Sequence, residues 1–278
     1  MKISTEIGAA ARLVGYEEAV RLVAQAGFDA WDFSLACFRI EDFPTEVEGL
    51  ELARKLKAIG LEYGIVCNQS HAPFPSSFEN LPQIKTAIRC SAEAGASICV
   101  VHPIAFNASV EENAAFYREL LSVARECDIK IAAENLLGWD DQKEECFFAS
   151  CGTTEYYKAL LDAVDDPYFV ACVDIGHAEQ LPTGEGAPAM IRAVAHRLAA
   201  LHVHDNDRKA DLHQLPLTMS IDFDAVMHAL REVDYQGELT LEAVYYLKDH
   251  TASNVADGLR RMAQTARDLA DRFEKLEH

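Results

Sequence analysis

The chain has 278 residues, half of them hydrophobic, and its 45 acidic and 25 basic side chains give a formal net charge of −20. A negative field of that size repels phosphate backbones and anionic lipid, so we expect no nucleic-acid partner and no membrane partner. No stretch approaches the roughly 20 consecutive apolar residues of a membrane span, and the N-terminus lacks the apolar core of a signal peptide. A cytoplasmic protein is therefore expected.

Short apolar runs alternate with longer helical patterns along the whole chain. The expected strands are Lys2–Thr5, Ala30–Leu35, Tyr63–Asn68, Ser97–His102, Lys130–Asn135, Val170–Ile175, Leu201–His204 and Glu238–Ala243. A helical pattern follows each of them, near Glu17–Ala26, Thr45–Ile59, Pro82–Ala94, Ser109–Cys127, Thr153–Val164, Ala187–Leu198, Phe223–Val233 and from Ser253 to the end.

This alternation predicts the fold class. Strands that alternate with helices indicate βαβ units, and eight such units in this length predict an α/β fold, a (β/α)8 TIM barrel, as a single domain over residues 1–278. A doubly wound sheet usually brings a glycine-rich phosphate loop, and neither GxGxxG nor GxxxxGK[ST] occurs. No nucleotide cofactor is therefore expected.

Two segments that follow expected strands are longer than the others, Gly138–Gly152 and Asp207–Ser220. In a barrel, length added after a strand falls on the face that carries the chemistry. Phe147 and Phe148 in the first segment fit either an apolar lid or a contact in a homo-oligomer. The second segment contains no glycine, so it must turn without the residue that adopts positive φ most easily.

Ionisable or amide side chains stand at the carboxyl ends of six successive expected strands. They are Asn68 with His71, His102, Glu134 with Asn135, Asp174 with His177, His202 with His204, and Glu242. Polar groups in apolar strands cost free energy unless they are paired or bind a metal. Carboxylates and imidazoles suit Mn²⁺, Mg²⁺, Co²⁺ or Zn²⁺, so we expect one divalent metal ion at this end of the barrel.

The motifs Glu134-Asn135, Asp174-x-x-His177, His202-x-His204-Asp205 and Glu242 resemble the xylose-isomerase-like TIM-barrel superfamily, strand by strand over nearly the whole chain. The superfamily includes sugar phosphate isomerases and epimerases, ketose 3-epimerases and the type-IV apurinic endonucleases. The resemblance implies a metal held by Glu134, Asp174, His202 and Glu242.

The resemblance to the ketose 3-epimerases also implies a mechanism. Glu134 and Glu242 would be the catalytic acid/base pair, acting on opposite faces of a substrate carbon through an enediolate. His177, Arg208 and Asp140 would contact the substrate; the match is weakest for Asp140, because its loop differs in length.

Five residues, His177 among them, also resemble the additional zinc ligands of the apurinic endonucleases: His71, His102, His177, Asp211 and His213. In sugar isomerase-like members of the superfamily, the same positions bind substrate instead, so either role is open. A nuclease must hold several phosphates with Lys and Arg. Around this site the loops are acidic or neutral apart from Arg208-Lys209, which favours sugar chemistry.

The sequence therefore predicts a divalent-metal-dependent isomerase or epimerase of a small sugar, sugar phosphate or related ketose. One alternative is a metal-dependent lyase or dehydratase acting on a ketose-like substrate. A second is a polynuclear-zinc phosphoesterase of the apurinic endonuclease type, and a third is a metal-stabilised sugar-binding subunit without turnover.

Overall fold

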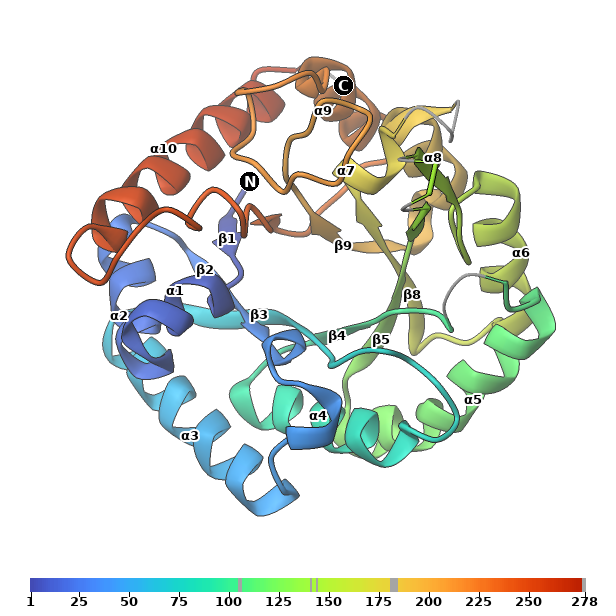
Figure 1. Ribbon diagram of the computed structural model, residues 1–278, viewed down its shortest axis with the longest axis horizontal. Coiled ribbons are helices and arrows are strands. Elements are labelled where there is room, and N and C mark those ends of the chain that lie inside the picture. The colour runs from blue at the N-terminus through green and yellow to red at the C-terminus, as the bar shows by residue number, and fades with distance from the viewer. Residues whose placement is uncertain (105–106, 141, 144, 181–184, 277–278) are drawn as a thin grey trace.

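The centre of the molecule is a ring of parallel strands enclosed by helices (Figure 1). The computed structural model describes residues 1–104, 107–140, 142–143, 145–180 and 185–276. The barrel strands are β1 (Ile3–Thr5), β2 (Ala30–Ser34), β3 (Val66–His71), β4 (Ile98–Val101), β5 (Lys130–Glu134), β8 (Phe169–Asp174), β9 (Leu198–His202) and β10 (Leu239–Leu241). Six of them form one sheet in the order β2-β3-β4-β5-β8-β9, and β1 pairs with β10.

Two parallel bridges close these sheets into a barrel. Glu6 bridges Asp32 and thereby joins β1 to β2, while Val203 bridges Leu241 and joins β9 to β10. The second junction includes a backbone hydrogen bond of 2.9 Å from Val203 N to Thr240 O. The closed ring confirms the predicted (β/α)8 barrel, and it gathers the carboxyl ends of all eight strands at one face.

The helices pack around the outside of the ring. They are α2 (Tyr16–Ala26), α3 (Glu46–Glu62), α4 (Leu81–Ala94), α5 (Val110–Cys127), α6 (Thr154–Val164), α8 (Gly186–Val194), α9 (Phe223–Glu232) and α10 (Val255–Glu274). Two short helices, α1 (Gly8–Val14) and α7 (Ile175–Ala178), lie instead at the carboxyl ends of β1 and β8. Most of the core lies between helices and strands, where apolar stripes such as Leu259, Met262 and Leu269 of α10 are buried. None of the described helices is long and apolar enough to cross a membrane.

Several predicted boundaries were wrong. The strand expected at Tyr63–Asn68 is β3, which starts later because α3 extends to Glu62 and Gly64 makes the turn at φ 78°. His71 consequently lies in the strand itself. The strand expected at Leu201–His204 is β9, which starts earlier because α8 ends at Val194, before the expected Leu198.

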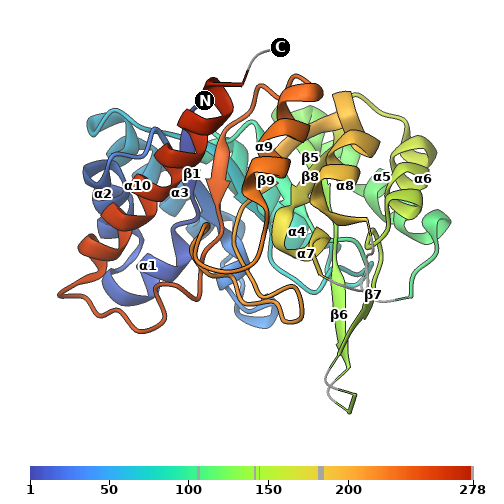
Figure 2. The same cartoon turned by 90° about the horizontal axis from the view of Figure 1, so that it is seen from above.

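The final predicted strand was also too long. β10 ends at Leu241, so Glu242 follows the strand and is not part of it. The prediction also missed two short helices, α1 and α7, and two strands, β6 (Leu137–Asp140) and β7 (Glu145–Phe148), which form an antiparallel hairpin inside the first long insertion. The hairpin projects away from the barrel (Figure 2). These segments are too short to show a period of their own.

Candidate active site

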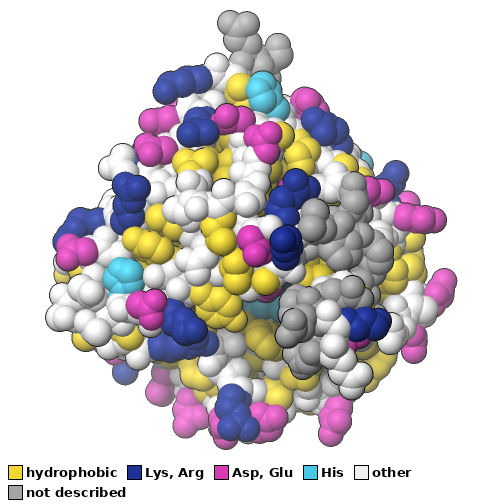
Figure 3. Space-filling model, turned by 45° about the horizontal axis from the view of Figure 1, so that its top comes forward, with side chains coloured by type: hydrophobic (Ala, Val, Ile, Leu, Met, Phe, Trp, Pro, Cys, Tyr) yellow, Lys and Arg dark blue, Asp and Glu magenta, His cyan; other side chains and the backbone are white. Residues whose placement is uncertain are grey.

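A cavity of about 310 Å³ opens at the carboxyl ends of the strands. Figure 3 shows a histidine within a hollow, with hydrophobic side chains along the part of its border that is described. The ionisable residues that line the cavity, apart from Arg12 and Cys37, are Glu6, His71, His102, Glu134, His177, Asp211, His213 and Glu242. The predicted site residues therefore converge mainly on this one cavity.

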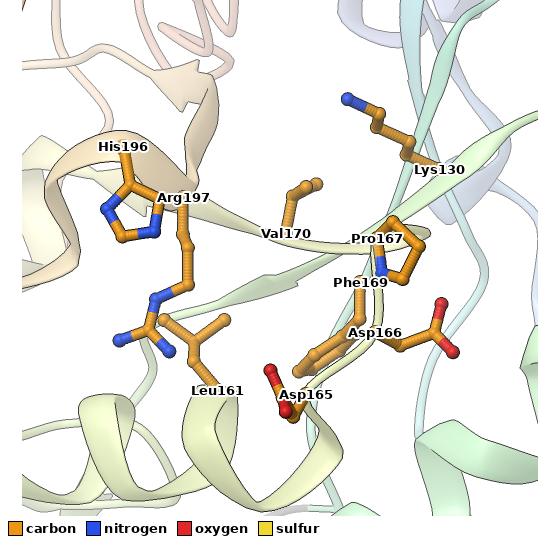
Figure 4. A pocket seen from close by; sticks show the side chains of 9 residues that line it. All are labelled: Lys130, Leu161, Asp165, Asp166, Pro167, Phe169, Val170, His196 and Arg197. Carbon is orange, nitrogen blue, oxygen red and sulfur yellow. The ribbon is translucent and has the colours of Figure 1, made fainter.

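A second cavity, of about 320 Å³, lies at the opposite end of the barrel (Figure 4). Lys130 and Phe169, the first residues of β5 and β8, are among its lining residues. Its charged side chains have mixed sign, and Arg197 is bonded to Asp162 at 2.5 Å. None of its lining residues belongs to a potential metal-binding group among the described residues.

The four residues expected to hold a metal form one compact group. Glu134 and Asp174 end β5 and β8, His202 ends β9, and Glu242 follows β10; one ligand atom of each lies within 4.8 Å of the others. Glu134, Asp174 and His202 are at most 1% exposed. Adjacent register places Asp174 opposite His202. The strand ends thus bring the predicted ligands together.

The Asn135 side chain links the carboxyl end of β5 to that of β8 by hydrogen bonds. Its side-chain oxygen accepts from Asp174 N at 2.7 Å, and its Nδ2 donates to Asp174 O at 2.9 Å. Its backbone oxygen accepts from His177 Nδ1 at 2.9 Å. The Glu134-Asn135 pair therefore combines a candidate ligand with the residue that orients the next strand end.

The ionisable side chains of this group lie close enough to change one another's pKa values. His202 Nδ1 lies 3.0 Å from Glu134 Oε1 and 3.5 Å from Glu242 Oε2. Burial alone would raise the pKa of Glu134, but the imidazoles of His202 and His102 hold that pKa well below its ordinary value. The pKa of Asp174 is likewise lowered to about 2, because His177 and His204 outweigh the effect of burial. Both carboxyl groups are therefore ionised at neutral pH.

A second group shares Glu134 and consists of His71, His102 and Glu134. Both imidazole Nε2 atoms lie 3.2 Å from Glu134 Oε2 and 3.0 Å from each other. His71 Nδ1 is 2.9 Å from the Ala72 carbonyl oxygen, which can only accept, so Nδ1 carries a proton. In the neutral imidazole the lone pair is then on Nε2 and faces the carboxylate.

A third group consists of His177, His204, Asp211 and His213. Asp211 Oδ2 lies 3.0 Å from His213 Nε2 and 3.4 Å from His177 Nε2. The Nδ1 atoms of His177 and His213 face carbonyl oxygens at 2.9 Å, so both histidines present Nε2 to Asp211. Burial alone would lower the pKa of His213, but Asp211 raises it to about 9.

These donor sets fit divalent cations. The Nε2 lone pair of a neutral His71 aimed at the Glu134 carboxylate repels it unless a proton or a cation lies between them. Asp174 Oδ2 is buried and has no hydrogen-bond partner among the described residues. A mixed set of carboxylate oxygens and imidazole nitrogens suits Mn²⁺, Co²⁺ or Zn²⁺, and Mg²⁺ where the oxygens dominate. The four-residue group could hold one cation. The other groups, which include a further set of His71, His202 and Glu242, offer alternative or additional positions.

Two of the expected substrate contacts lie elsewhere. Arg208 donates from Nε to the Glu179 backbone oxygen at 3.2 Å, and its Nη2 is 3.4 Å from Glu179 Oε2. Asp140 is in the hairpin, where its Oδ1 accepts from Gln142 N at 3.0 Å. Neither residue is among those that line the cavity, whereas His177 is. Phe147 is 36% exposed, and the Phe148 side chain lies outside the described residues.

Sequence reasoning missed two buried acids at this end of the barrel, Glu6 and Asp32. Glu6 Oε2 accepts from Gly8 N at 2.6 Å and from Ser34 Oγ at 2.8 Å, and burial raises the pKa of Glu6 to about 7. Glu6 directly follows β1, so its position matches the other strand ends. Asp32 lies within β2 and faces the barrel interior beside Gln69.

Two half-exposed aromatic residues flank the cavity and contact its histidines. Phe74 stacks on His102 with ring centroids 5.2 Å apart, and Tyr245 meets His213 edge-on at 5.6 Å. Both rings are among the lining residues. The mouth therefore combines charged groups at its base with apolar faces at its sides.

The chain is similar to proteins of one fold family. A family model described as xylose isomerase-like TIM barrel matches residues 20–265. Uncharacterized protein y4fM of Sinorhizobium fredii is 26% identical over 207 residues, a match that covers 67% of this chain and 62% of that protein. The match thus spans less than two thirds of that relative's length.

Solved structures with similar folds include three proteins named as epimerases or epimerase-like. A D-tagatose 3-epimerase-like protein gives a TM-score of 0.72 at 21% identity, covering 96% of this chain and 99% of that one. D-allulose 3-epimerase from Methylomonas sp. gives 0.72 at 15%, covering 98% of both chains. 3-Keto-D-glucoside 4-epimerase YcjR from E. coli gives 0.70 at 18%, covering 95% and 99%. At these identities the likeness shows a common fold.

Proposed function

This chain belongs to the xylose isomerase-like TIM barrel family, and on that premise we propose that it is an isomerase or epimerase of a small sugar, sugar phosphate or related ketose. Glu134, Asp174, His202 and Glu242 would hold one divalent cation. When bound, that cation would stabilise negative charge that develops on the substrate oxygens.

One observation carries the assignment of the acid and the base. Within the four-residue group, Glu134 and Glu242 line the cavity, whereas Asp174 and His202 are not among its lining residues. The two glutamates come from β5 and from the end of β10, with β8 and β9 between them in the ring. They therefore approach a bound substrate from different directions.

This placement suits proton transfer at a carbon next to a carbonyl. One carboxylate removes the proton from one side of the carbon, and the other carboxyl group returns a proton to the opposite side. Glu242 has 16% side-chain exposure and Glu134 has 1%, so both are shielded from water while facing the cavity. His177, which also lines the cavity, would hydrogen-bond a substrate oxygen.

The test is exchange of substrate carbon-bound hydrogen in deuterated water, followed by NMR over a panel of ketoses and ketose phosphates with Mn²⁺ present. Glu134→Gln and Glu242→Gln should each lower exchange by about 10²- to 10⁴-fold. Glu111→Gln, an exposed change on α5, should leave it unchanged. Full exchange in either cavity variant would contradict the two-glutamate mechanism. Exchange accompanied by loss of water would indicate the lyase or dehydratase alternative.

Two of the further groups, His71–His102–Glu134 and His177–His204–Asp211–His213, favour a second candidate, a polynuclear-metal phosphoesterase. Both groups border the same cavity, and Glu134 belongs to one of them as well as to the four-residue group. Metal analysis of the purified protein distinguishes the candidates. One equivalent of Mn, Co or Mg per chain supports the isomerase proposal. Two or three equivalents of Zn per chain, together with hydrolysis of phosphoesters, would contradict the isomerase proposal and support the phosphoesterase.

A further inference from the structure

Asp32 is a buried carboxylate with little compensation from its surroundings. It lies on β2 and is 1% exposed. Gln69 Nε2 donates to Asp32 Oδ2 at 2.9 Å, while Oδ1 has no hydrogen-bond partner among the described residues. A carboxylate removed from water costs several kcal/mol unless a cation or further hydrogen bonds offset it. Its place in the barrel interior therefore needs an explanation.

The imidazole of His202 offers an explanation for the position of Asp32. In His202 the ring nitrogen that faces the carboxylates is Nδ1, whereas in three other histidines of the site it is Nε2. His71, His177 and His213 each place Nδ1 on a carbonyl oxygen and offer Nε2 to a carboxylate. His202 offers Nδ1 to Glu134 and Glu242. Its Nε2 has no hydrogen-bond partner in the described part of the chain.

The acidic group that faces this Nε2 is Asp32, whose Oδ2 lies 3.8 Å away. A neutral imidazole that offers the Nδ1 lone pair to a cation must carry its proton on Nε2. Histidines that bind metals commonly donate that second N–H to a carboxylate, which fixes the tautomer and raises the basicity of the ligating nitrogen. Asp32 Oδ2 faces the nitrogen that carries this proton, at a distance somewhat longer than a hydrogen bond.

A polar network holds Asp32 in position. Thr240 Oγ1 donates to Gln69 Oε1 at 3.1 Å and accepts from Asn68 Nδ2 at 3.2 Å. Asn68 Oδ1 accepts in turn from Ser4 Oγ at 2.7 Å. The network joins β1, β3 and β10 and ends at the Gln69 amide, which holds Oδ2 of Asp32.

We propose that Asp32 is a positioning residue that fixes His202 with Nδ1 toward the metal group, a role that rests on the proposed metal site. Asp32 need not touch the substrate. Its charge acts through the His202 ring, and the network beneath the site holds that charge in place. The polar interior of the barrel is thereby part of the candidate active site.

The experiment measures Mn²⁺ and Zn²⁺ affinity, by competition with a chromogenic chelator, and the Tm of the metal-free protein. Asp32→Asn should weaken metal binding about 10- to 100-fold without lowering the metal-free Tm, because it removes a poorly compensated buried charge. The matched control is Asp29→Asn, one residue before the same strand. Asp29 accepts from Ile3 N at 2.8 Å and from Arg267 at 2.9 Å, so this change should lower the Tm and leave metal affinity unchanged.

A spectroscopic measurement on the unmutated protein keeps the proposal testable if Asp32→Asn does not fold. In ¹⁵N-histidine-labelled protein loaded with Zn²⁺, His202 is identified by the resonances lost in His202→Gln. We expect its proton on Nε2, and a proton on Nδ1 would overturn the inference. Unchanged metal affinity in Asp32→Asn would overturn the inference alone. A wild-type protein that binds neither metal would overturn both the inference and the proposed function.

Discussion

The strand-end group of Glu134, Asp174, His202 and Glu242 differs from the group that includes Asp211 and His213 in how the backbone is held. Three of the strand-end side chains belong to barrel strands, and three are at most 1% exposed. Asp211 and His213 lie on the loop after β9, with side-chain exposures of 42% and 11%. The strand-end group is thus fixed by the sheet, whereas the loop group depends on the conformation of an irregular segment.

One carboxylate holds much of that loop in place. Asp205 is fully buried, and its two oxygens accept from five backbone N–H groups, those of Asn206, Thr218, Met219, Ser220 and Ile221. Arg208, His213 and Leu217 turn the chain at positive φ without glycine. The unusual turn chemistry expected of this segment is confirmed, and it depends on a side-chain anchor.

The largest expected effect separates the two groups directly. Asp174→Asn should weaken Mn²⁺ or Zn²⁺ binding by at least about 100-fold, since even the loss of a residue behind a ligand costs about 10- to 100-fold. Asp211→Asn should leave the affinity of the strand-end group unchanged. Competition with a chelator at one metal equivalent measures both. An equal loss in the two variants would show that the groups act as one centre.

The second prediction uses carboxylates with different neighbours. The imidazoles of His177 and His213 hold the pKa of Asp211 well below its ordinary value. The pKa of Glu6 is raised from 4.5 to about 7, mainly by burial and to a smaller extent by the charge of Glu242. Between pH 4.5 and about 7, Glu6 keeps its proton in the folded chain and has lost it in the unfolded chain. The stability that protonated Glu6 contributes is therefore fully present below pH 4.5 and is lost as the pH rises to about 7.

The wild-type free energy of unfolding, relative to that of Glu6→Gln, should therefore fall by up to about 3 kcal/mol across this range. Urea unfolding of the metal-free proteins at several pH values measures the difference. Glu111→Gln, an exposed change far from the cavity, is the control and should show no such dependence. If the free energies of unfolding of wild type and Glu6→Gln differ by the same amount at every pH, the raised pKa of Glu6 is refuted.

A third, smaller effect tests the loop anchor. Asp205→Asn keeps one acceptor oxygen but loses the charge-assisted hydrogen bonds, which should cost about 2 kcal/mol of stability. We expect the third histidine–carboxylate group to lose any cation it binds while the strand-end group keeps its own. Chemical denaturation and metal analysis report these results separately. Simultaneous loss of both cations would mean that the loop also supports the strand ends.

The smallest expected effect concerns Leu217, which is 40% exposed and has φ 67°. A left-handed conformation costs a non-glycine residue about 1 to 2 kcal/mol. Glycine avoids this cost, but it also loses more backbone entropy on folding, which offsets part of the gain. Leu217→Gly should therefore raise the free energy of unfolding by less than about 1 kcal/mol. A clear destabilisation would show that the Leu217 side chain contributes packing that outweighs its backbone strain.

The fold and much of the candidate site were predictable because both follow from local patterns. The alternation of apolar runs with helical periods predicts a barrel, and the barrel places residues at strand ends on one face. Glu134, Asp174, His202 and Glu242 could therefore be grouped by their sequence positions, even though the ends of β9 and β10 were misplaced. Residues on irregular segments were harder, because Arg208 and Asp140 were matched by spacing alone.

The sequence by itself determined the order of the main strands and helices, the net acidity and which carboxylate and imidazole side chains meet at the barrel mouth, since periodicity and parallel connections leave little choice. Only the tertiary structure decided that Arg208 bonds Glu179 and that Asp32 faces His202. It also decided that Glu6 is buried beside the cavity. These contacts join residues from different strands and loops, and their geometry depends on ring closure, strand register and loop conformation, which no local pattern encodes.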